Sequence, residues 1–180
     1  MTQQDIQELE KKAIAGDQAA QFSFGRLLVV NNYYEAGKDF IVKASEQQNE
    51  DAVKWIALHQ KLTKALETVD ISESMEGKKL NLWNVKEGEG KDIFSFSSLT
   101  DESIIIFIDK SDGPIKHFHT ELISEKYFHI LFDLWEAYLN GVIKIKDIKP
   151  TKNAKYLISI LHYILENNPE LQKEISNDSK

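Results

Sequence analysis

Apolar residues recur every three to four positions through the first third of the chain, which is the spacing of amphipathic helices. Polar pairs interrupt this pattern at Gly16-Asp17, Asn31-Asn32 and Gln48-Asn49. Each pair carries residues that commonly end a helix or cap the next one. We therefore expect a helical segment over 3–69. After a first helix ending near Ile14, the expected helices cover 18–30, 34–47 and 50–68.

Two stretches of this segment, 11–22 and 43–54, resemble each other. Gly16 and Gln48 occupy the equivalent turn position, and Ala20 and Ala52 occupy the equivalent position for a close helix contact. Self-similarity over a few tens of residues is typical of stacked helical hairpins. The pattern therefore predicts antiparallel helix pairs joined by short turns.

The pattern changes after a polar stretch that we interpret as a linker. Alternating or continuous apolar runs predict strands at 80–85, 92–96 and 103–108, with a possible fourth at 115–119. Helical spacing returns from Ile123 to Tyr138 and again over 154–165, ending at Asn168-Pro169. An antiparallel meander followed by two helices gives an α+β fold for 79–172, which we expect to pack with 3–69 as one compact unit. The tryptophans are expected in the core: Trp55, Trp83 and Trp135.

Residues 15–25 read Ala-Gly-Asp-Gln-Ala-Ala-Gln-Phe-Ser-Phe-Gly, and 43–47 read Lys-Ala-Ser-Glu-Gln. These motifs resemble the Sel-one-like relative of the tetratricopeptide repeat, with its Gly-Asp turn and its hairpin end. The second copy departs from the family at Gln48-Asn49 and at Ala57, and about one and a half repeats fit. The resemblance implies helical hairpins that act as a scaffold for protein contacts, capped by the rest of the chain.

The net charge and the composition of the chain argue against several classes of function. The 180-residue chain carries a net charge of −7 and no cysteine, which excludes disulfides and argues against generic nucleic-acid binding. The longest apolar run, Ile104 to Ile108, is too short to cross a bilayer, and the first residues lack the pattern of a signal peptide. We expect a cytoplasmic protein with no membrane partner. A lysine-rich stretch over 144–155 is interpreted as the solvated side of a turn and a helix start.

Few residues suggest a catalytic or metal-binding role. His117 and His119 are spaced to share one face of a strand, and Glu121 or Asp109 could add a third metal ligand. An exposed edge strand explains the same pattern more simply. His129 and His162 lie in helices with no visible catalytic partner. No cofactor is expected.

We therefore expect a non-enzymatic protein that binds another protein. As a whole the chain resembles a bacterial immunity or antitoxin protein, which implies that it neutralises a cognate toxin by direct binding. Acidic side chains would suit a basic toxin domain. The alternatives are a regulatory adaptor built on helical repeats, and a metal-dependent hydrolase using His117 and His119. The expected partner-binding residues are Tyr33, Tyr34, Glu87, Glu89, Asp101, Glu102, Asp109 and Asp112.

Overall fold

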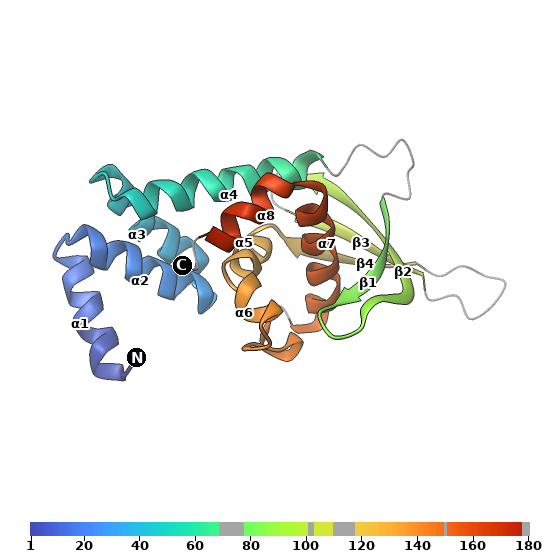
Figure 1. The fold of residues 1–180 in the computed structure, drawn as a ribbon, viewed down its shortest axis with the longest axis horizontal. Coiled ribbons are helices and arrows are strands. Elements are labelled where there is room, and N and C mark those ends of the chain that lie inside the picture. Colours follow the sequence, from blue (N-terminus) through green and yellow to red (C-terminus); the bar gives the residue numbers. More distant parts are fainter. Residues whose placement is uncertain (69–77, 101–102, 110–117, 150, 178–180) are drawn as a thin grey trace. The chain divides into compact units, whose positions relative to one another are not determined.

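The computed structural model describes residues 1–68, 78–100, 103–109, 118–149 and 151–177. The fold is α+β, as the sequence predicts, and within the described residues it contains eight α-helices and a four-stranded sheet (Figure 1). The chain divides into two compact units, Met1–Gln60 and Lys61–Lys180. The division falls inside a long helix, before the polar stretch in which the sequence placed the linker.

Helices make up the first unit. They are α1 (Gln3–Ile14), α2 (Gln18–Val30), α3 (Tyr34–Glu46) and the start of α4 (Glu50–Thr68). The bounds expected for α2 and α4 are confirmed, and α3 ends one residue before its predicted end. The buried side chains of Val29 and Ile41 contribute to the core, and so does Trp55, as expected.

The same turn ends each of the first three helices. Gly16, Asn32 and Gln48 adopt left-handed φ angles of 95°, 72° and 64°. In every case this residue donates its N–H to the carbonyl three positions earlier, and the following N–H donates to the carbonyl five positions earlier. These paired hydrogen bonds define the Schellman motif, which satisfies the last carbonyl groups of a helix.

The helices that follow the first and third turns begin in the same way. A side-chain oxygen of Asp17 accepts a hydrogen bond from the N–H of Ala20 at 2.8 Å, and Asn49 does the same for Ala52 at 2.9 Å. Both alanines are buried. The two similar stretches of sequence, 11–22 and 43–54, therefore correspond to two structurally equivalent turns, each followed by a capped helix.

The second unit contains an antiparallel meander of β1 (Lys78–Asn84), β2 (Gly88–Thr100), β3 (Ser103–Asp109) and β4 (Phe118–Ser124). The apolar run of β3 occupies a central strand, as expected. The fourth strand runs on to Ser124, so the prediction that helical structure begins at Ile123 is wrong. Residues 115–117 of the predicted strand lie outside the described part of the chain.

Four helices and two short 3-10 turns follow the sheet. They are α5 (Lys126–Asp133), α6 (Trp135–Leu139), η1 (Ile145–Asp147), η2 (Thr151–Asn153), α7 (Ala154–Asn167) and α8 (Pro169–Asn177). The single helix predicted up to Tyr138 is divided at Leu134, where ψ is −1°. α7 packs along β1, and the ring of its Tyr156 meets Phe94 edge to face at 5.0 Å. Both rings are buried in the core of the unit, and Figure 1 shows α7 beside the sheet.

Candidate functional site

The β1–β2 hairpin carries two of the expected acidic residues, Glu87 in the turn and Glu89 at the start of β2. Both side chains are exposed. The amide of Asn84 donates to Glu87 at 3.2 Å, and the amide of Asn81 donates to Glu89 at 3.3 Å. A neighbouring amide therefore orients each carboxylate at the surface.

The other expected acidic residues are not brought together with this turn by anything the structure describes. Asp109 is the last residue of β3, and its backbone pairs with Phe118. Asp101, Glu102 and Asp112 lie outside the described residues.

The two expected tyrosines differ in exposure. Tyr33 follows the left-handed residue of the α2–α3 turn, and 64% of its surface is exposed. Tyr34 begins α3 and is buried, with the ammonium of Lys38 6.0 Å from its ring centre. Only Tyr33 therefore presents its ring at the surface of the unit.

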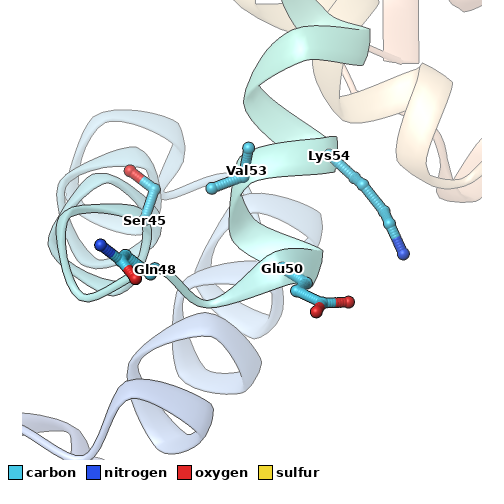
Figure 2. Close-up of a pocket in the computed structure, with 5 residues that line it drawn as sticks. All are labelled: Ser45, Gln48, Glu50, Val53 and Lys54. Carbon is cyan, nitrogen blue, oxygen red and sulfur yellow. The ribbon is translucent and has the colours of Figure 1, made fainter.

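A shallow pocket lies beside the α3–α4 turn (Figure 2). Ser45 and Gln48 come from the end of α3 and its turn, and Glu50, Val53 and Lys54 come from the first turns of α4. The lining combines a hydroxyl, an amide, two opposite charges and an exposed valine. The hydroxyl of Ser45 donates to the carbonyl of Val42 within its own helix at 2.7 Å.

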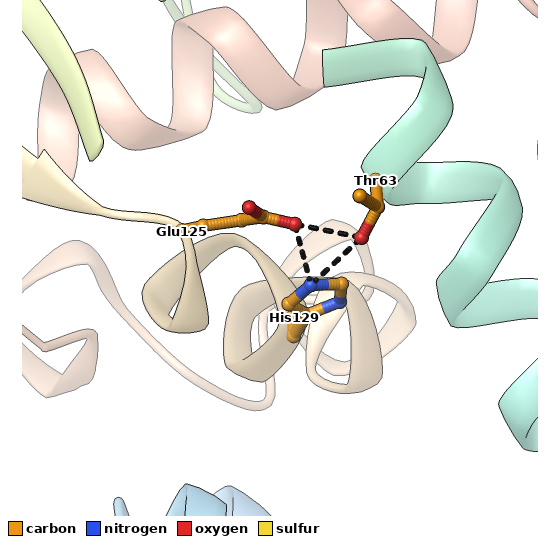
Figure 3. A network of polar contacts seen from close by, with 3 residues as sticks. All are labelled: Thr63, Glu125 and His129. Atoms are coloured by element: carbon orange, nitrogen blue, oxygen red, sulfur yellow. Dashed lines mark hydrogen bonds and ion pairs between the residues drawn. The ribbon is translucent and has the colours of Figure 1, made fainter. Parts of the chain in front are cut away.

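A polar cluster within the second unit joins α4 to α5 (Figure 3). The hydroxyl of Thr63 donates to the Glu125 carboxylate at 2.6 Å. Nε2 of His129 lies 3.1 Å from the same carboxylate oxygen and 3.4 Å from the Thr63 hydroxyl. This cluster was not predicted from the sequence, where the spacing of Glu125 and His129 by one helical turn is its one signal.

The geometry of this cluster differs from that of a catalytic triad. In a triad the carboxylate holds one ring nitrogen and the nucleophile contacts the other. Here Glu125 and Thr63 both approach Nε2 of His129, and Thr63 gives its proton to the carboxylate. The cluster therefore stabilises the packing of α4 on α5.

His162 belongs to an aromatic stack on α7. Its ring lies 3.8 Å from that of Trp83, and Trp135 lies 5.9 Å from Trp83. Burial lowers the pKa of His162 below its usual value of 6.5, and the carboxylates of Glu166 and Glu89 partly offset this effect. The ring is consequently favoured in its neutral form, packed on the tryptophan.

The possible metal pair is only partly visible. His117 lies outside the described residues, and His119 is a residue of β4 whose backbone pairs with Ile108. Within the described part of the chain, no three His, Cys, Asp or Glu side chains gather closely enough to hold a metal ion. The same residues include no helix long and apolar enough to span a bilayer.

Comparison with known proteins adds no relative. No family model, curated protein or solved structure matches the chain.

Proposed function

We propose that the chain is a non-enzymatic, cytoplasmic protein of the immunity or antitoxin type, which neutralises a cognate toxin by binding it directly. The observation that carries the proposal is the α2–α3 hairpin with its exposed tyrosine. The motifs of this hairpin resemble the Sel-one-like repeats, a family of scaffolds for protein contacts.

The hairpin has the properties of a rigid binding element. Gly25 of α2 and Gly37 of α3 allow the two helices to touch, and the turn between them is closed by two backbone hydrogen bonds. Tyr33 is therefore presented on a fixed backbone. A tyrosine held in this way supplies a large contact area at little entropic cost, which is why interfaces are enriched in this residue.

The acidic turn between β1 and β2 offers a second contact. The exposed carboxylates of Glu87 and Glu89 would suit a basic surface, such as the cleft of a toxin that acts on nucleic acid. Long-range attraction between an acidic inhibitor and a basic toxin would also speed their association.

The first experiment is affinity capture of the tagged chain from its native cell, followed by mass spectrometry. One stoichiometric basic protein that kills cells when expressed alone, and is harmless when expressed with this chain, would support the proposal. Several substoichiometric, non-toxic partners would favour the adaptor instead, and the absence of any partner would contradict both.

The binding surface is tested with two variants of similar exposure. Tyr33→Ala should weaken the captured complex by about 1–2 kcal/mol, the cost of losing a moderate interface anchor. Ile14→Ala removes an exposed apolar side chain at the other end of the same unit and should leave binding unchanged. Equal losses from both variants would show that Tyr33 has no specific role.

A further inference from the structure

One end of the second unit brings together the β1–β2 turn and the end of α6 (Figure 1). The backbone N–H of Val85, in that turn, donates to the hydroxyl of Tyr138 at 3.2 Å. Tyr138 is the second-last residue of α6 and is itself buried. Two segments more than fifty positions apart in the chain therefore share one surface.

Both segments carry exposed apolar side chains. Val85 and Leu139 are exposed, and Val142 exposes 77% of its surface. Val142 is held in place, because Gly141 adopts a left-handed φ of 70° and the N–H of Val142 donates to the carbonyl of Ala137 at 2.8 Å. A patch of exposed apolar side chains on a fixed backbone is typical of an interaction site.

Exposed charges of both signs occur on these two segments. Glu87 lies in the β1–β2 turn and Glu89 is the second residue of β2. Lys144 and Lys146 follow Val142 in the chain. The nearby carboxylate of Asp147 already accepts the backbone N–H of Lys144 at 2.9 Å.

We propose that this surface binds a second copy of the chain through a two-fold interface. We call it the Val142 face, and it consists of Val85, Glu87, Glu89, Val142, Lys144 and Lys146. A two-fold rotation places the apolar centre against itself and lays the carboxylates of one copy on the ammonium groups of the other. The presence of both signs around one apolar centre favours a second copy over a partner of a single charge.

Dimerisation at the Val142 face has a consequence for the proposed function. Glu87 and Glu89 are also the side chains that would contact a basic toxin. The dimer would cover them, so that toxin and second copy would compete for this turn. Dimerisation and toxin binding can be tested separately, because self-association is measured on the purified chain without any toxin.

The first test is sedimentation equilibrium of the full chain over a range of concentrations. We expect the mass to rise from 20.7 kDa towards twice that value. Val142→Glu places a charge at the apolar centre and should weaken dimerisation about tenfold or more. Ile14→Glu places the same charge on an apolar residue of similar exposure in the other unit and should have no effect. A monomeric wild-type chain, or a Val142→Glu variant that dimerises normally, would overturn the proposal.

A charge exchange tests the two-fold geometry itself. One variant carries Lys144→Glu with Lys146→Glu, and the other carries Glu87→Lys with Glu89→Lys. Each variant alone should be monomeric, because like charges would then face each other. An equimolar mixture should form heterodimers, since both contacts become attractive again. Failure of the mixture to associate, when the wild-type chain dimerises, would show that the charges do not pair across the interface.

Discussion

Gly25 of α2 and Gly37 of α3 face each other with room for only a hydrogen atom on each. A Cβ atom built on Gly25 would lie 2.7 Å from the carbonyl oxygen of Gly37, and one built on Gly37 would lie 2.5 Å from the carbonyl oxygen of Gly25. The side chains of Ile41 and Val29 also lie within 2.7 Å of these positions, and the backbone oxygens cannot move aside unless the helices separate. This contact fixes how closely the two helices of the hairpin pack.

The first prediction follows from that contact. Gly25→Ala and Gly37→Ala should each destabilise the first unit by about 1–3 kcal/mol, since the clash outweighs the gain in helix propensity. The measurement is urea unfolding followed by circular dichroism. Ala36→Ser changes an exposed neighbour on α3 and should shift the midpoint only slightly. A stabilised Gly25→Ala variant would mean that the helices are farther apart.

The turn at Gln48 gives a prediction of the opposite sign. Gln48 holds a left-handed φ of 64°, which is strained for any residue with a Cβ. Gln48→Gly should therefore raise the free energy of unfolding by about 0.5–1 kcal/mol. Lys43→Gly, five residues earlier and inside α3, should lower it by a similar amount because glycine disfavours the helix interior. If both changes destabilise the chain equally, the turn geometry is wrong.

Thr63 gives a test of the polar cluster in the second unit. Thr63→Val keeps the shape of the side chain but removes the hydroxyl that donates to Glu125. The loss should cost about 1–2 kcal/mol in thermal or urea unfolding, because a partly buried carboxylate loses a hydrogen bond. Thr63→Ser retains the donor and should lose less. Greater destabilisation by serine than by valine would show that packing, rather than the hydrogen bond, matters at this position.

His162 predicts how stability depends on pH. Its pKa in the folded state is lower than the usual value of 6.5, so the unfolded chain binds the proton first as the pH falls. The stabilising contribution of the neutral ring is complete above about 6.5 and is lost as the pH falls from there to the lowered pKa. His162→Gln should therefore flatten the fall in stability over this interval. The measurement compares the urea midpoints of the two chains between about pH 7.5 and about pH 5. Identical slopes would contradict the shift.

The helical hairpins were predictable because their signals are local. Asp17 and Asn49 each cap a helix through their own side chains, and Gly16 and Asn32 each tolerate the left-handed conformation at a helix end. Such interactions span a few residues. The bounds of α2 and α4 could therefore be predicted from local sequence, without knowledge of tertiary contacts.

The second unit was harder to predict where neighbouring elements share residues. Ile123 fits the apolar stripe of a following helix, yet it ends up buried in β4. Leu134 interrupts the helix without glycine or proline, so no local signal marks the break. Pro169 was expected only to end α7, but proline also suits the first position of a helix, and α8 begins there.

Contacts between distant residues of the second unit could not be inferred from spacing. Thr63 meets His129, sixty-six positions later, because the packing of α4 on α5 brings them together. The approach of Val85 to Tyr138 likewise depends on how the sheet meets α6. A pattern of apolar positions predicts which side of an element is buried, but it does not give the partner of a polar atom.

The left-handed residues at positions 16, 32 and 48 make the first unit modular. The three positions are evenly spaced, and the two helices between them, α2 and α3, are both 13 residues long. Residues 17–48 thus form a cassette. It begins at Asp17, which caps α2, and it ends at Gln48, the left-handed residue that ends α3. Duplicating this cassette would add a hairpin whose ends match the existing turns, so the gene could lengthen or shorten the array in whole steps without redesigning a junction.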